Sequence, residues 1–123
     1  MSPTHLFSPE LKKGSIEMLV LSLVEARPRH GYEIGKLIES RSGGRLTFAL
    51  PTLYPTLLRL ENRGWLKGRW VERAGERERC FYRLTRAGRR VLAERRKTWK
   101  SYVASINDVM FDTPLRLGKP GDA

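Results

Sequence analysis

The side chains best suited to chemistry in this sequence are arginines and lysines, not nucleophiles or proton carriers. Between Arg63 and Lys100 there are fourteen Lys or Arg residues and four Glu residues, so this segment alone carries a net charge of +10. The whole chain of 123 residues carries +11. A basic field concentrated in one segment predicts binding to a polyanion, such as DNA, RNA or an anionic membrane surface. A surface tuned for solubility is the alternative, but it does not explain the concentration.

Groupings typical of catalysis or metal binding are missing from the sequence. The only histidines, His5 and His30, are far apart, and there is no P-loop, metal-spaced cluster or nucleophile motif. The carboxylates are scattered among arginines, which keep them ionised. Cys80 is the only cysteine, so no intrachain disulfide can form. It could be a redox sensor, but its expected inward position favours a small core residue. We therefore expect a binding protein without cofactor or metal, and not an enzyme.

The sequence also indicates where the protein works. Its first residues, MSPTHLFSPELKKG, lack the order of charge, apolar run and cleavage site of a signal peptide. The longest apolar stretch, MLVLSLVEA, is interrupted by Glu25 and is far shorter than the ~20 residues of a membrane span. We expect a soluble, cytoplasmic protein without a membrane partner.

Hydrophobic periodicity predicts two helices before residue 45. The first is expected to run from Ser8 or Pro9 to about Glu25. Two apolar stripes on it imply burial on both sides, more than a monomer of this size provides. Pro28 separates it from a second helix, which begins near His30 or Gly31 and stops at Gly43 and Gly44. The stripes are Ile16, Leu19, Val20 and Leu23, and Leu11, Met18 and Leu21.

A third helix is predicted within FALPTLYPTLLRLENRGW, although this stretch contains Pro51 and Pro55. We expect Thr52 to be the N-cap. Pro55 would then lie in the first turn, where its missing N–H has no intrahelical partner in any case. The inward-facing residues would be Leu53, Leu57 and Leu60, and the helix would end between Asn62 and Gly64. The residues left outside would be Thr52, Tyr54, Pro55, Thr56 and Arg59.

After Gly64 the hydrophobic period changes from 3.6 to 2. Two alternating runs, WLKGRWVE and RCFYRLT, are separated by the charged segment RAGERE, which predicts a β-hairpin. Leu66, Gly68 and Trp70 share one face of the first run, and Cys80, Tyr82 and Leu84 share one face of the second. Thr85 is expected to cap a last helix that reaches about Phe111. Its heptad-like apolar seam comprises Leu92, Trp99, Val103, Ile106 and Met110.

This order of elements predicts a mostly α protein with a small β-hairpin. Residues 8–85 would form a winged helix-turn-helix domain, residues 86–111 a C-terminal dimerisation helix, and residues 112–123 a flexible tail. An α-helix fits the major groove of DNA, and a basic hairpin can reach phosphates or a minor groove. An RNA-binding or architectural winged helix is the alternative. Double-stranded RNA, however, hides its bases in a deep and narrow major groove, where a reader helix would have no purpose.

Three segments carry a resemblance to a known family: RHGYEI (29–34), TLYPTLLRLENRGW (52–65) and FYRLTRAGRRVL (81–92). In this combination the chain resembles the PadR family of bacterial transcriptional regulators, in its short branch with a single C-terminal helix. The resemblance covers roughly Leu11 to Met110. It departs from many relatives at TFA (47–49), which lead into the third helix.

The resemblance implies a homodimeric repressor that binds a pseudo-palindromic operator in double-stranded DNA. The dimer would form through the N-terminal and C-terminal helices, and some relatives bind flat aromatic effectors between such helices. We place the dimer and effector surface at Trp99, Val103, Ile106 and Met110, with Leu19 and Leu23. Trp99 could sandwich a small aromatic effector against its symmetry mate, or could be plain dimer core.

The DNA contacts are expected on the third helix and the hairpin. Tyr54 could contact a phosphate and a sugar, or pack in the capping turn. Thr52 and Thr56 could touch a phosphate or a thymine methyl group, and Thr52 could serve only as a cap. Arg59 could reach a base edge or phosphate, or form an ion pair with Glu61 or another neighbour. Pro55 lies at the same tip of the helix.

Further contacts are expected from the hairpin and the second helix. We expect Arg73, Arg77 and Arg79 to meet phosphates. His30 opens the second helix, where backbone N–H groups can hold a phosphate. Lys36 could touch the DNA backbone or be solvated. Tyr32 opens the helix beside His30 and could take part in the same phosphate site, but its helical spacing with apolar residues favours the core.

Overall fold

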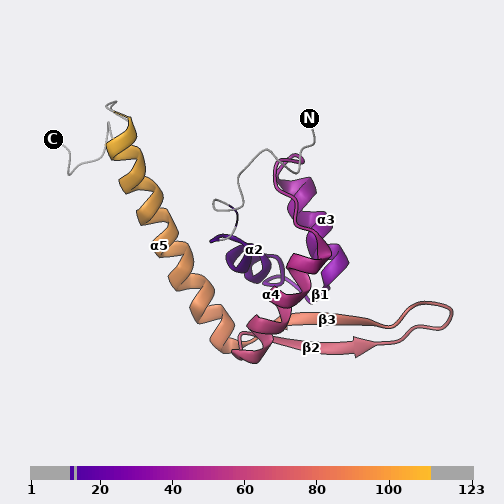
Figure 1. The fold of residues 1–123 in the computed structure, drawn as a ribbon. Helices are drawn as coiled ribbons and strands as arrows, with labels where there is room; N and C mark the ends of the chain where they lie inside the picture. Colours follow the sequence, from indigo (N-terminus) through magenta and orange to yellow (C-terminus); the bar gives the residue numbers. More distant parts are fainter. Residues whose placement is uncertain (1–11, 13, 112–123) are drawn as a thin grey trace. The chain divides into compact units, whose positions relative to one another are not determined.

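The computed structural model describes Lys12 and residues 14–111, which form four helices and three strands (Figure 1). The chain divides into two compact units, and the division falls after Leu92, inside the last helix. Most of the predicted start of the first helix, residues 8–11 and 13, lies outside the described residues, as does the predicted tail at 112–123. The domain boundaries proposed from the sequence stay predictions.

Helix α2 (Ile16–Leu23) lies in the core of its own chain. Leu21, from one predicted stripe, and Leu23, from the other, are both buried against the rest of the chain. Leu23 is only 7% exposed within its own chain, which leaves little of it for a partner, and its place on a dimer surface stays a prediction. Leu19 is partly buried against the same core.

Helix α3 (Gly31–Arg41) begins and ends as its sequence predicts. The Nδ1 atom of His30 accepts a hydrogen bond from the backbone N–H of Glu33 at 3.2 Å, which is an N-cap interaction. At the other end Gly43 and Gly44 have φ values of 64° and 79°, in the left-handed region that glycine tolerates best. The N–H of Gly44 donates to the carbonyl of Glu39 at 2.8 Å and so satisfies one free carbonyl of the last turn.

Helix α4 (Leu50–Asn62) starts earlier than predicted, so Thr52 is not its N-cap. Ala49 is the N-cap and offers only its carbonyl, which accepts from the N–H groups of Thr52 and Leu53 at 2.9 and 3.0 Å. Pro55 therefore lies inside the helix, and its missing N–H leaves the carbonyl of Pro51 without a helical donor. Pro51 is exposed, so water can solvate that carbonyl.

The sheet has three strands, one more than the predicted hairpin. Strands β2 (Leu66–Val71) and β3 (Arg79–Leu84) pair antiparallel in the predicted alternation, with Gly68 opposite Tyr82. A short strand β1 (Arg29–His30) pairs with the other edge of β3, giving the order β1-β3-β2. Two residues are too few to show an alternating pattern, which is why the sequence did not reveal β1.

The core joins the helices to the base of the hairpin. Leu53, Leu57 and Leu60 of α4 are fully buried, as predicted. Leu66 and Leu84, at the base of the hairpin, complete the same cluster. The helix-turn-helix formed by α3 and α4, followed by a β-hairpin wing, is a winged-helix fold, as expected from the sequence.

Helix α5 (Arg86–Met110) opens on the predicted cap. The Oγ1 atom of Thr85 accepts a hydrogen bond from the N–H of Gly88 at 3.0 Å and donates to the carbonyl of Gly64 at 2.6 Å. Leu92 is buried in the core of the first unit. The part of α5 beyond it presents a row of exposed apolar side chains: Trp99, Tyr102, Ile106, Val109 and Met110.

Candidate nucleic-acid interface

The outer face of α4 presents most of the residues predicted to read DNA. Thr52, Tyr54, Pro55 and Arg59 are all exposed, so each can meet an external partner. Thr56 is the exception, because it is only 2% exposed. Its Oγ1 atom donates to the carbonyl of Thr52 at 3.1 Å. This bond satisfies the hydroxyl and lets it enter the core, so the prediction that Thr56 lies outside is wrong.

Tyr54 is held in place by a glycine on the neighbouring helix. A Cβ atom on Gly31 would come within 2.5 Å of Cε1 of Tyr54, so the tyrosine ring lies directly over the start of α3. The ring is nonetheless 46% exposed. One side of the Tyr54 ring thus packs in the turn, while the rest remains accessible, and its contact with DNA stays a prediction.

Arg59 is paired with α2 and not with Glu61. Its Nε atom lies 3.2 Å from the Oε2 atom of Glu17, and Nη1 of Arg63 lies 3.2 Å from Oε1 of the same carboxylate. Glu61 instead accepts a hydrogen bond from the N–H of Gly68 at 3.0 Å. A single carboxylate on α2 therefore pairs with one arginine of α4 and with the C-cap arginine that follows it, and both arginines are partly open to solvent.

The wing carries three predicted phosphate contacts, Arg73, Arg77 and Arg79, on and beside a loop that turns at Gly75, where φ is 76°. All three side chains are exposed. Within the described part of the chain, Arg73 and Arg77 have no ion pair, although Glu76 and Glu78 are close in sequence. Free guanidinium groups at the end of a hairpin are suited to phosphate oxygens.

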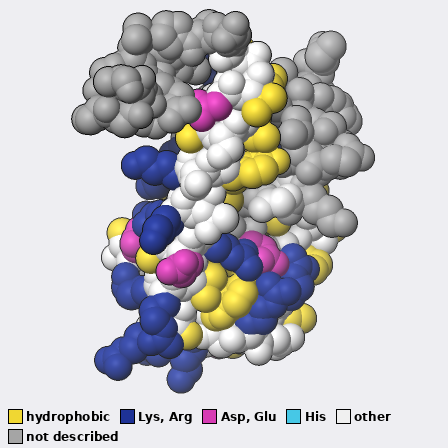
Figure 2. Space-filling model, turned by 90° about the vertical axis from the view of Figure 1, so that its left-hand side faces the viewer, with side chains coloured by type: hydrophobic (Ala, Val, Ile, Leu, Met, Phe, Trp, Pro, Cys, Tyr) yellow, Lys and Arg dark blue, Asp and Glu magenta, His cyan; other side chains and the backbone are white. Residues whose placement is uncertain are grey.

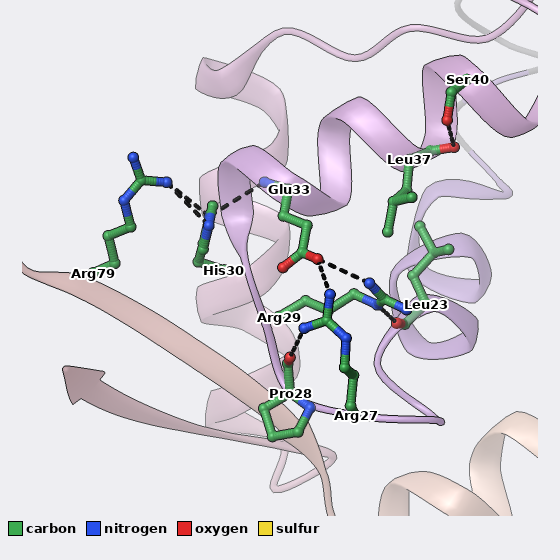
Figure 3. A network of polar contacts seen from close by, with 9 residues as sticks. All are labelled: Leu23, Arg27, Pro28, Arg29, His30, Glu33, Leu37, Ser40 and Arg79. Carbon is green, nitrogen blue, oxygen red and sulfur yellow. Dashed lines mark hydrogen bonds and ion pairs between the residues drawn. The ribbon is translucent and has the colours of Figure 1, made fainter.

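Arg79 points back to the start of α3, where it meets His30 (Figure 3). Its Nη1 atom lies 3.0 Å from Nε2 of His30, and the histidine ring stands edge-on to Phe81. Burial and the Arg79 charge lower the pKa of His30, so the imidazole is neutral at pH 7. A neutral imidazole has one acceptor nitrogen, so it can accept from the N–H of Glu33 or from Arg79, but not from both. The contact with His30 involves only one of the guanidinium nitrogens of Arg79, so the remaining donors can still meet an external anion.

A buried arginine anchors the segment before α3. Arg29 donates from Nε to the carbonyl of Leu23 at 2.5 Å and from Nη1 to Glu33 at 2.9 Å. Arg27 also bonds to Glu33, so one carboxylate lies between two guanidinium groups (Figure 3). Burial works to raise the pKa of Glu33, but the hydrogen bonds and charges of Arg27 and Arg29 outweigh it and hold the pKa below its usual range. These ion pairs and hydrogen bonds hold the segment from Arg27 to Arg29, which leads into α3, in a fixed position.

An open cleft of about 580 Å³ lies between the start of α3, the start of α4 and the inner face of the wing. Three aromatic residues in its lining, Tyr32, Trp70 and Tyr82, were not predicted as site residues. Tyr32 is 51% exposed, so its predicted core position is wrong: at the second position of α3 it lies on the outer side of the helix, away from buried Ile34 and Ile38. Trp70 of β2 is 65% exposed.

Cys80 lines the same cleft, but its surroundings do not favour a reactive thiolate. It is partly buried, and burial raises the pKa of its thiol, which keeps the sulfur protonated at neutral pH. A Cβ on Gly68, across the strand pair, would lie only 2.7 Å from its sulfur. Cys80 is thus a packing residue, as the sequence favoured, although it is less deeply buried than expected.

Lys36 lies on the polar side of α3. Its Nζ atom is 3.9 Å from Oε1 of Glu39 and 5.6 Å from the centre of the Tyr32 ring. Both contacts are loose and exposed, so they leave the ammonium group accessible. A role of Lys36 in contacting DNA stays a prediction.

The outer face of the hairpin is also basic. Lys67 lies directly opposite Arg83, and Arg69 follows on the same face of β2. Together with Arg73 and Phe81 these residues line an open hollow of about 510 Å³. Lys and Arg side chains also gather over the lower half of the face that Figure 2 draws, which is not the side of the molecule toward which the hairpin extends in Figure 1. Because β2 is an edge strand, charges there also prevent pairing with other chains.

The described residues contain no helix long and apolar enough to cross a membrane. Nor do three or more His, Cys, Asp or Glu side chains meet as a possible metal site in that part of the chain. The surface that remains is an exposed helix, a basic wing and the cleft between them. A protein with this fold and this surface belongs to the winged-helix class of DNA-binding proteins.

Comparisons with known proteins agree with this class. A family model described as the transcriptional regulator PadR-like family matches residues 20–94. A solved transcriptional regulator from Clostridium thermocellum superposes with a TM-score of 0.78 at 28% identity, covering 85% of this chain and 99% of that one. A PadR family transcriptional regulator from Eggerthella lenta gives a TM-score of 0.75 at 32% identity, with 85% and 88% covered. An uncharacterised protein from Lysinibacillus sphaericus is 28% identical over 103 residues, which are 84% of this chain and 94% of that relative.

The chain belongs to the PadR-like family of transcriptional regulators. It is a DNA-binding regulator of transcription and not an enzyme. The resemblance stated from the sequence is thereby confirmed.

Proposed function

We propose that this protein represses transcription as a homodimer that occupies a pseudo-palindromic DNA operator in the cytoplasm. The observation that carries the proposal is the apolar row on α5 beyond Leu92. Trp99, Tyr102, Ile106 and Met110 follow one another at spacings of three and four residues and are all exposed. Such a row on a helix is typical of a surface that packs against a second helix.

A second copy of the chain is the simplest partner for this row. In a two-fold dimer the same face of both helices meets itself, and two copies of α4 and of the wing are presented together. Each copy would read one half-site, and the half-sites would lie about one helical turn, ~34 Å, apart. Occupation of a promoter by such a dimer would block transcription from it.

The same row suggests where an effector would act. The rings of Trp99 and Tyr102 lie 6.2 Å apart and both are exposed, so they offer apolar surface to a flat aromatic molecule as well as to a partner helix. A molecule inserted between the two α5 helices would change the separation of the two α4 helices, and with it the fit to the operator. If Trp99 is plain dimer core, aromatic compounds will leave its fluorescence and the operator affinity unchanged.

Selection of bound duplexes from a random DNA library, followed by footprinting, tests the proposal. We expect an inverted repeat, protection of both half-sites, loss of transcription from a promoter that contains it, and a dimer in sedimentation equilibrium. Ile106→Asp should yield a folded monomer with weakened operator binding, whereas Ser105→Asp, its exposed neighbour, should change neither property. A monomeric wild type that protects a single half-site would contradict the proposal, as would stronger binding to RNA than to duplex DNA.

A further inference from the structure

Trp70 is a large apolar side chain in an unexpected place. It lies on β2, an edge strand of the sheet, and is 65% exposed. Its strand neighbours Lys67 and Arg69 are the kind of residue that edge strands normally display. An indole that is mostly in water contributes little to the core, so the fold itself does not account for Trp70.

The surroundings of Trp70 combine apolar and cationic surface. It faces the cleft of about 580 Å³, together with the exposed side chains of Tyr54 and Leu50 from α4. Arg77 and Arg79 of the wing line the same cleft, and the pairing of Trp70 with Cys80 places the indole on the face of the hairpin that Cys80 and Tyr82 share. Among the described residues that line the cleft, Glu78 is the one carboxylate, next to those two cations in the sequence.

We infer that this cleft holds the sugar–phosphate backbone of one DNA strand, with Trp70 packed against the deoxyribose. The inference rests on DNA binding through α4 and the wing. A protein that places a helix in the major groove and a hairpin in the adjacent minor groove straddles the strand that separates the two grooves. The space between helix and hairpin is where that strand must pass.

The chemistry of the cleft matches the chemistry of a backbone. A DNA strand alternates anionic phosphates with apolar sugar faces. The cleft offers guanidinium groups for the first and the faces of Trp70 and Tyr54 for the second. Because the cleft is open to solvent and is not an enclosed cavity, a continuous strand can enter it. Trp70 therefore contributes an apolar contact that does not depend on base sequence.

An apolar contact and a phosphate contact can be told apart by salt. Removing a phosphate contact lowers the slope of log K against log[salt] by about 0.9, whereas removing an apolar contact lowers the affinity equally at every salt concentration. The binding of a labelled mixed-sequence duplex of about 30 base pairs, long enough for two half-sites, can be followed by fluorescence anisotropy between about 50 and 200 mM NaCl.

We expect Trp70→Ala to weaken binding about 5- to 30-fold at all salt concentrations without changing the slope, and Trp70→Phe to restore most of the loss. Arg77→Ala should lower the slope. Val71→Ala, on the opposite face of the same strand, is the matched control and should leave both affinity and slope unchanged. Circular dichroism of each variant checks that it is folded.

Unchanged affinity of a folded Trp70→Ala variant, alongside a lowered slope for Arg77→Ala, would overturn the inference and leave DNA binding intact. A lowered slope for Trp70→Ala would also overturn it, because the indole would then be acting through a phosphate contact. No binding of wild type to any duplex would overturn DNA binding itself, and the inference with it.

Discussion

Replacing Gly88 by alanine tests how closely the start of α5 is fitted to the end of α4. The carbonyl of Trp65 accepts a hydrogen bond from the N–H of Thr85 at 3.1 Å, just before α5 begins. A Cβ on Gly88 would lie 2.1 Å from that same carbonyl oxygen and 2.7 Å from Cδ1 of Leu84. The oxygen belongs to the backbone, so it cannot move aside without loss of the hydrogen bond.

The expected effect reverses the usual rule for helices. In an exposed helix Gly→Ala stabilises by about 1 kcal/mol. At Gly88 we expect the overpacking to cost about 1–3 kcal/mol more than this gain, because the carbonyl of Trp65 and the side chain of Leu84 must both shift. A net loss of about 2 kcal/mol would lower the Tm by about 8–16 °C for a domain of this size.

Gly35 in α3 is the matched control for this experiment. A Cβ there would meet only Cδ2 of Leu53, at 3.4 Å, which is an ordinary contact. Gly35→Ala should therefore leave the free energy of unfolding unchanged or raise it by up to about 1 kcal/mol. Urea denaturation, followed by circular dichroism at equal protein concentrations, measures both variants. If Gly88→Ala proved as stable as Gly35→Ala, the close approach of α5 to Trp65 would be refuted.

Two further predictions concern charges around α3 and α4. Glu17→Gln removes the carboxylate that pairs with Arg59 and Arg63. We therefore expect tighter DNA binding at low salt, and a slope of log K against log[salt] that is steeper by about 1–2. An unchanged slope would show that neither arginine contacts DNA. Because the folded state lowers the pKa of His30 below its usual 6.5, the unfolded chain binds the proton first, and stability should fall as pH drops below about 6.5. His30→Asn keeps an N-cap acceptor that does not titrate, so the difference in urea midpoint between variant and wild type should change between about pH 7.5 and 5.5; parallel profiles would contradict this role of His30.

The elements with strong periodicity were predictable. The three inward leucines of α4 recur at helical spacing, and the two strands of the wing alternate cleanly, so both assignments were confirmed. Thr85 has the ordinary position and chemistry of an N-cap. These features depend on residues that are near one another in the sequence, and a sequence pattern reports such local relationships.

The start of α4 was mispredicted because the deciding group is on the backbone. Ala49 caps the helix with an extended conformation and a carbonyl, while its side chain has no capping atom. Thr52 looked like the cap only because threonine often is one. Thr56 was mispredicted for a related reason: its hydroxyl bonds to the carbonyl of Thr52, so a residue that a pattern counts as polar can be buried.

The cleft could not be assembled from the sequence, because it depends on contacts between distant segments. The alternation correctly placed Trp70 on the same face as Leu66, but the hairpin extends past the core and leaves the indole exposed. Tyr54 lies over Gly31 only because α3 and α4 meet at their starts. The residues that neighbour Trp70 and Tyr54 in the sequence indicate neither of these placements.

Strand β1 couples the hairpin mechanically to helix α3. Because Arg29 and His30 pair with Tyr82 and Phe81, the hairpin is bonded on one side to the segment that leads into α3. A displacement of the wing is therefore transmitted through β1 to His30, the N-cap residue of α3, without passing through α4. If this hairpin were grafted onto another protein, the Arg29–His30 dipeptide would have to be included. Without it, β3 as well as β2 would be an unpaired edge strand.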